Sequence, residues 1–425
     1  MVYAPRTLAD RWLREIGLST MDRRSHYTLG GLGAAVAACA LLFGSRPHAA
    51  ASSARVPVDP REVLESLPFA ANDARSREIS ELRRALTAAP NDQPRAVRLA
   101  RLDLVLARER SDPRYLGHAQ AALAPWWNET AAPVEVLVLR ATIRQSLHDF
   151  DAALVDLDRA VRVAPDHVQA WLTRAVVLTV RGRYVEARES CAHLTSMTSA
   201  LVASVCRTQI DCVTGRAELA STGLRDVLTR AGKVSPDEEA WARSQLGECA
   251  TRAGQLDEAE REYQRTLELD PDDAYVRAAL ADLLLDRARP KESLAIVRGR
   301  EVNDTLLLRI ALAEKRLAAP EAKSHVDALA ARFDASRLRG DVVHRREEAR
   351  FWLELKEDPA RALALAQANW EVQREPADVR ILVDAAYGAK QPNGAAAALA
   401  WLDETKLQDP FIAKTAAALR GMSAK

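Results

Sequence analysis

The feature that most constrains this chain is a repeat of about 34 residues in which small side chains recur at fixed positions. The stretch at 149–166, DFDAALVDLDRAVRVAPD, places Ala153, Leu157 and Ala160 on one face of an expected helix before a proline ends it. Ala187 follows Ala153 after 34 residues. Alanine at a core position implies that another helix approaches closely there, since no bulky side chain fills the space.

The pattern recurs in successive copies. Segment 148–160 aligns with 182–194, and Ala141 in the preceding helix aligns with Ala175. The clearest copy is at 238–273. One pair of helices cannot bury its own apolar face, so we expect stacked copies to share a continuous interior.

This pattern resembles that of the tetratricopeptide repeat family, which combines a Leu-Gly or Leu-Ala pair, a Gly turn, aromatic and Ala positions and a final Pro. In the clearest copy these positions carry Leu246, Gly247, Gly254, Leu256, Ala259, Tyr263 and Pro271. The resemblance covers most of 78–405 and is strongest in 134–299. It implies an all-α fold, a right-handed α-solenoid of stacked antiparallel helix pairs whose first helices line a concave surface.

The organisation that we predict follows the strength of the repeats. An N-terminal extension with a signal peptide or anchor (1–50) precedes degenerate helical repeats (51–133), the clear repeats (134–299), an irregular helical segment (300–345) and degenerate C-terminal repeats (346–425). In the last of these, Ala362 and Ala397 are 35 residues apart and restore the pairing.

Residues 21–54 have the pattern of a secretory signal. Two arginines precede an apolar run at 29–43, and small residues follow around 49–51. We therefore predict export to the bacterial periplasm. An uncleaved run that anchors the chain in the inner membrane is one alternative, and lipidation at Cys39 is another. Translation from either Met1 or Met21 fits this pattern.

Four cysteines follow the signal-like segment, and all lie between 191 and 249. An even number of cysteines in an exported protein allows disulfides. Three pairings are possible. In a solenoid the second helix of one pair touches the first helix of the next, which favours Cys191 with Cys206. Cys212 and Cys249 lie at similar depth on adjacent first helices, which favours the second pair. The alternative is that all four are small buried thiols.

Charge and motifs argue against several function classes. The 60 basic and 59 acidic residues are interspersed, so no basic stripe indicates a nucleic acid. No GxSxG, Walker, GxGxxG or HExxH motif occurs, and we predict a protein that is not an enzyme and has no cofactor and no metal. The weaker enzyme alternative is a site in 300–345, where the candidates are Asp304, His325, Asp327, Asp334 and His344.

Arginines recur at one repeat position, as Arg140, Arg174 and Arg207. A ladder of cations could bind an acidic or phosphorylated ligand. We favour the simpler interpretation, in which each aliphatic stem packs between helices and each guanidinium reaches a neighbouring carboxylate.

The concave surface is the expected binding site for a protein or peptide partner. The residues projected onto it are Val138, Thr142, Leu172, Val176, Val202, Val205, Gln209, Trp241 and Tyr275. This mixed, centrally apolar surface suits an extended or helical peptide with apolar anchors. We predict a partner-binding scaffold of the cell envelope, in which glutamate at Val176 and Val205 abolishes binding without unfolding. The alternative is that a neighbouring segment or a second copy fills the groove, as in a self-associating component of an envelope or polysaccharide machinery.

Overall fold

The computed structural model describes residues 74–110, 112–338, 340 and 343–423, and every regular element within these residues is helical. The helices are α2 (Ala74–Ala88), α3 (Gln93–Arg110), α4 (Arg114–Ala122), α5 (Val134–Ser146), α6 (Phe150–Val163), α7 (Val168–Val180), α8 (Tyr184–His193), α9 (Ala200–Cys212), α10 (Ala217–Arg230), α11 (Pro236–Arg252), α12 (Leu256–Leu269), α13 (Ala274–Asp286), α14 (Pro290–Val297), α15 (Asp304–Leu317), α16 (Ala322–Leu338), α17 (Arg345–Arg350), α18 (Pro359–Trp370), α19 (Pro376–Gly388), α20 (Ala396–Thr405) and α21 (Pro410–Ser423). Short 3-10 or π segments are η1 (Ala124–Trp126), η2 (Leu194–Ser196), η3 (Phe351–Leu355) and η4 (Pro392–Ala395).

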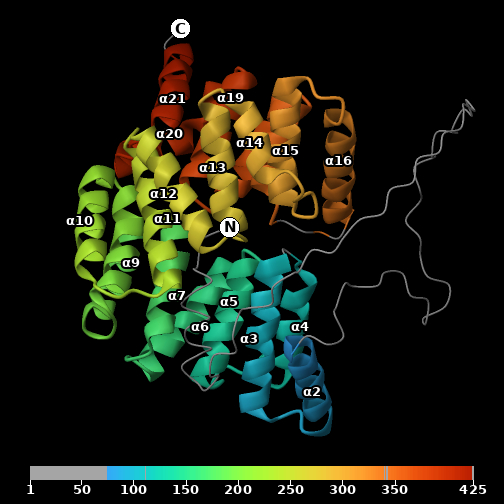
Figure 1. Cartoon of the computed structure of the whole chain (residues 1–425), viewed down its shortest axis with the longest axis vertical. Coiled ribbons are helices and arrows are strands. Elements are labelled where there is room, and N and C mark those ends of the chain that lie inside the picture. The colour runs from blue at the N-terminus through green and yellow to red at the C-terminus, as the bar shows by residue number, and fades with distance from the viewer. Residues whose placement is uncertain (1–73, 111, 339, 341–342, 424–425) are drawn as a thin grey trace, which may run out of the picture.

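Consecutive helices form pairs, and each pair packs on the next. We call α5, α7, α9, α11, α13 and α15 the first helices, and α6, α8, α10, α12, α14 and α16 the second helices. The row of pairs bends, so that α2–α4 and α15–α16 lie on one side of the molecule and α9 and α10 lie on the other (Figure 1). The predicted all-α solenoid of stacked helix pairs is confirmed.

Small side chains lie at the helix crossings, at the positions predicted from the repeat. Ala153, Ala187 and Ala259 are each 0% exposed. In the C-terminal pair the expected residue is wrong by one position, because Ala397 is exposed and Ala398 is buried. The 3-10 turn η4 directly precedes α20 and shifts the buried face by one residue from the repeat register.

Gly247 marks the closest crossing in the clearest repeat. A Cβ at this position would lie 2.5 Å from the ring of Tyr263, which projects from α12. We expect Gly247→Ala to lower the free energy of unfolding by about 1–3 kcal/mol, because the buried ring has to move. Urea unfolding compared with Gly223→Ala, at a site with nothing within 4 Å, measures this cost. Equal losses at both sites would contradict it.

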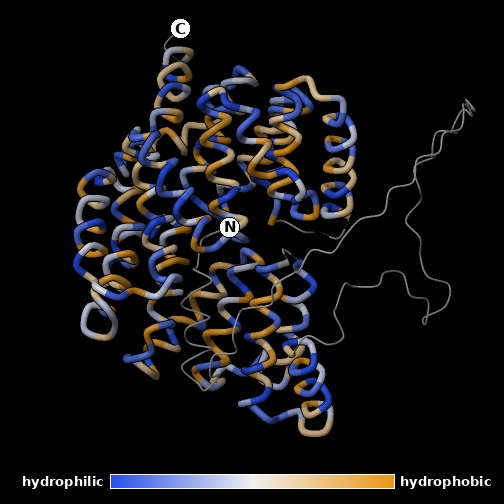
Figure 2. The backbone as a smooth tube through the Cα atoms, viewed as in Figure 1, coloured by the Kyte–Doolittle hydropathy of each residue, from blue (hydrophilic) through white to orange (hydrophobic). Residues whose placement is uncertain are grey.

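First and second helices differ in how much of their surface is covered. On α7 most residues are buried, including Leu172, Val176 and Val180. The buried residues of α12 are few: Ala259, Tyr263 and Thr266. Figure 2 shows apolar and polar residues alternating along the helices. The first helices are therefore enclosed, while the second helices carry the solvent-exposed surface.

The C-terminal unit (residues 345–423) has its own apolar cluster and packs against the turns that join first to second helices. Gly182 lies against Arg374, Gly215 against Lys406 and Gly254 against Pro410. These contacts join three successive turns of the clear repeats to one C-terminal unit.

None of the described helices has the length and apolarity needed to cross a membrane. The predicted signal peptide or anchor falls within 1–73, which lies outside the described residues.

Candidate functional site

The structure places most of the predicted groove in the interior. Thr142, Gln209 and Tyr275 are half-buried. The other six residues are buried, namely Val138, Leu172, Val176, Val202, Val205 and Trp241. All of these six except Val176 belong to the largest apolar cluster. This corrects the expectation that these side chains face solvent in an open groove.

The C-terminal unit occupies part of this side of the solenoid. The Arg374 backbone N–H donates to the Val180 carbonyl at 2.8 Å, and Arg181 donates to the Val372 carbonyl at 2.6 Å. Val372 packs against the apolar cluster of the first helices. The segment at 372–374 therefore packs against the end of α7 and the turn that follows it.

Charged pairs fix the C-terminal unit to the first helix α13. Arg350 donates to Asp282 at 2.7 Å, and Arg380 makes a bidentate pair with Asp286 at 2.6 and 2.7 Å. Burial acts to raise the pKa of Asp282, but Arg309 and Arg350 together hold that pKa well below its ordinary value. The carboxylate therefore stays charged, and the contact with α17 is kept.

The burial of Val205 changes what a substitution there does. Val205 is 0% exposed within the main core, so Val205→Glu places a carboxylate among apolar side chains. We expect it to lower the free energy of unfolding by about 3 kcal/mol or more, in place of the selective loss of binding that an open groove implies. Thermal unfolding followed by circular dichroism checks this. An unchanged melting temperature would mean that the position faces solvent.

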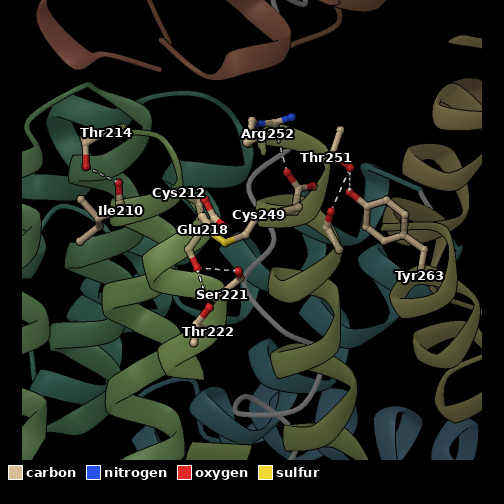
Figure 3. Close-up of a disulfide and its surroundings, with 12 residues drawn as sticks. Ile210, Cys212, Thr214, Glu218, Ser221, Thr222, Cys249, Thr251, Arg252 and Tyr263 are labelled. Carbon is tan, nitrogen blue, oxygen red and sulfur yellow. Dashed lines mark hydrogen bonds and ion pairs between the residues drawn. A yellow bond between two sulfur atoms is a disulfide. The ribbon is translucent and has the colours of Figure 1, made fainter. Parts of the chain in front are cut away.

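The four cysteines form two bridges. Cys191 in α8 bonds to Cys206 in α9, with Cα atoms 5.7 Å apart. Cys212 at the end of α9 bonds to Cys249 in α11, with Cα atoms 5.2 Å apart (Figure 3). These are the two pairs that the sequence favours. The bridges tie three successive repeats together around α9.

The arginine ladder is internal at two of its three positions. Arg140 makes a bidentate pair with Asp156 at 2.5 and 2.8 Å, and both side chains are buried. Arg174 pairs with Asp158 at 2.7 Å. Both carboxylates come from α6, which is the second helix of the pair that holds Arg140 and of the pair that precedes Arg174. Two of the arginines thus have the structural role that the simpler interpretation assigns to them.

The segment proposed for an enzyme site holds separate ion pairs. Asp304 pairs with Arg332, Asp327 with Lys323, Asp334 with Arg337, and His325 lies 2.7 Å from Glu314, while His344 directly precedes α17. Asp304, Asp327, Asp334 and His325 are thus each engaged by a different partner. Within the described residues, no three His, Cys, Asp or Glu side chains are grouped to hold a metal.

Exposed apolar side chains lie instead on three consecutive second helices. Val155 of α6 is 65% exposed, Val185 of α8 is 70% exposed and Leu219 of α10 is 73% exposed. These residues are not among those predicted from the sequence. Their signal is present, because Leu219 follows Val185 after 34 residues and repeats an apolar side chain at an outward position.

Comparison with known proteins identifies the repeats. Two tetratricopeptide repeat models match, at residues 138–195 and 224–298. No curated protein matches the chain. Similar solved structures include the type IV pilus biogenesis factor PilW, with 18% identity over 47% of this chain and 94% of that one (TM-score 0.39). Others are a tetratricopeptide repeat protein from Parabacteroides merdae, with 15% identity over 73% and 99% (TM-score 0.36), and human IFIT1, with 14% identity over 77% of each chain (TM-score 0.45).

Proposed function

Since this chain is a tetratricopeptide repeat protein with the fold of a protein interaction scaffold, we propose that it is a non-enzymatic scaffold of the bacterial cell envelope that binds a protein partner on its second helices. We choose this face because first and second helices differ in how far their apolar side chains are exposed. The first helices are enclosed, whereas Val155, Val185 and Leu219 project from successive second helices.

Burial of these side chains by a partner would be favourable. Covering a Val or Leu side chain contributes about 1.5–3 kcal/mol, so three such anchors supply much of the free energy of a moderate interface. Polar residues around them, such as Glu189 and Thr222, suit the rim of an interface between folded proteins.

The two disulfide bridges support a location of this protein in the cell envelope. Disulfides persist in oxidising compartments such as the bacterial periplasm and are rare in the cytosol. Both bridges lie in the central repeats that carry the proposed surface. The signal-like pattern at 21–54 supports the same compartment.

The test is affinity capture from envelope extract with the full chain and two variants. We expect Val185→Asp with Leu219→Asp to lose a stoichiometric partner that the unaltered chain retains. The matched control is Val302→Asp, at an apolar side chain that is 85% exposed outside this surface. Equal recovery by all three chains would exclude this face, and recovery of only the chain itself would favour a self-associating component.

A further inference from the structure

From a pocket between α8, α9 and α10 we infer a binding site for a carboxylate side chain of an acidic segment in the protein partner. This inference rests on the proposed function, because α8 and α10, which carry Val185 and Leu219, form two walls of the pocket, and the first helix α9 lies between them. A partner that binds in this way needs a negatively charged side chain in addition to apolar side chains.

The pocket is small, and one of its two arginines, Arg207, has no counter-ion. Its volume is about 290 Å³, just below the range of about 300–1,000 Å³ that encloses a drug-sized ligand. It therefore suits a single side chain. Ala203 and Val227 supply apolar walls, and Arg188, Arg207, Thr195 and Ser204 supply polar groups.

Arg207 lacks the counter-ion that its repeat equivalents have. Arg140 and Arg174 each bond to a side chain 16 residues further along the chain, Asp156 and Ser190 respectively, and Arg174 also pairs with Asp158. The corresponding position for Arg207 is Gly223, which has no side chain and nothing within 4 Å of where a Cβ would lie. Among the described residues Arg207 makes no ion pair or hydrogen bond, and its side chain is exposed.

Two other polar residues of the pocket, Arg188 and Ser204, differ in whether they already have a hydrogen-bond partner. Arg188 is already engaged, since it donates to Asp211 at 3.2 Å and to the hydroxyl of Thr214 at 2.5 Å. Ser204 is only 6% exposed, yet its hydroxyl has no hydrogen-bond partner within the part of the chain that the structure describes. The hydroxyl oxygen of Ser204 still reaches solvent, so it can donate to a ligand oxygen.

The walls of the pocket are held in place before a ligand arrives. Cys191 lines the pocket, and its bridge to Cys206 ties α8 to α9 beside Arg207. Because the helices need little further ordering, more of the interaction free energy appears as affinity.

The ligand chemistry follows from these groups. One guanidinium without a counter-ion matches a single negative charge, and its fork of donors fits the two oxygens of a carboxylate. The hydroxyl of Ser204 can donate to the same group, and the apolar walls accept a short aliphatic stem. A Glu or Asp side chain meets all of these requirements.

A labelled hexaglutamate peptide tests the site, with hexaglutamine as the uncharged control and fluorescence anisotropy as the readout on the full chain. We expect saturable binding of hexaglutamate alone, and we expect Arg207→Glu to weaken it about tenfold or more, since a charge-assisted hydrogen bond contributes about 1.5–3 kcal/mol. The matched variant is Arg261→Glu, at another exposed arginine on the second helix α12, and it should leave the affinity unchanged.

Two results would overturn the inference: absence of hexaglutamate binding by the unaltered chain, or equal losses from Arg207→Glu and Arg261→Glu, which would show only general attraction between charges. Neither result affects the capture experiment with Val185 and Leu219, so failure of this site is distinguishable from failure of the proposed surface. Circular dichroism of both arginine variants shows whether each is folded.

Discussion

Replacement of Ala259 by arginine is expected to unfold the central repeats. Ala259 is 0% exposed and lies in α12 among Ala250, Tyr263 and Leu280. A long side chain has no room at this crossing, and its charge would be buried without a partner. The expected loss is about 4 kcal/mol or more, which is a large fraction of the 5–15 kcal/mol typical of a domain.

Circular dichroism during urea unfolding measures this loss. The control is Gln264→Arg, which adds the same side chain to an exposed position of the same helix and should change stability by no more than about 0.5 kcal/mol. If Ala259→Arg unfolds at the same urea concentration as this control, helices do not nest at Ala259.

Reduction of the two bridges is expected to have the second largest effect. The Cys191–Cys206 bridge spans 15 residues and the Cys212–Cys249 bridge spans 37, for which the loss of unfolded-chain entropy corresponds to about 3 and about 4 kcal/mol. Thermal unfolding with and without dithiothreitol should show a marked fall in melting temperature.

Paired variants separate the contributions of the bridges. Cys191→Ser with Cys206→Ser should retain part of the response to dithiothreitol, and a chain that also lacks Cys212 and Cys249 should show none. Mass spectrometry after alkylation of the unreduced protein gives the direct check. Four alkylated thiols among these cysteines would rule out both bridges.

The fold could be predicted because its determinants are local and periodic. Ala153 and Ala187 mark the close crossings, and their spacing defines the helix pair without knowledge of distant contacts. The cysteine pairs follow from the same geometry, since neighbouring repeats always meet in the same way. The shift from Ala397 to Ala398 shows where this reasoning weakens, because a short 3-10 turn changes the register.

The docking of the C-terminal unit could not be predicted because it depends on contacts between remote segments. Arg181 bonds to the carbonyl of Glu371 across 190 residues, and no repeat pattern encodes that meeting. The assignment of Val205 to the groove was wrong because this side chain is 0% exposed within the main apolar cluster. The lack of a counter-ion for Arg207 could be predicted from the sequence, because Gly223 occupies the repeat position that supplies a side-chain partner in the two preceding repeats.

Cysteine labelling on a single helix tests the central claim, which is that small side chains nest inside the solenoid while the second helices face outward. Ala153→Cys and Val155→Cys lie two residues apart on α6, with exposed fractions of 0% and 65% for the native side chains. In a chain that also carries Cys39→Ser, we predict that maleimide modifies the cysteine at 155 rapidly and the cysteine at 153 only after denaturation. Equal labelling rates at the two positions would contradict the account.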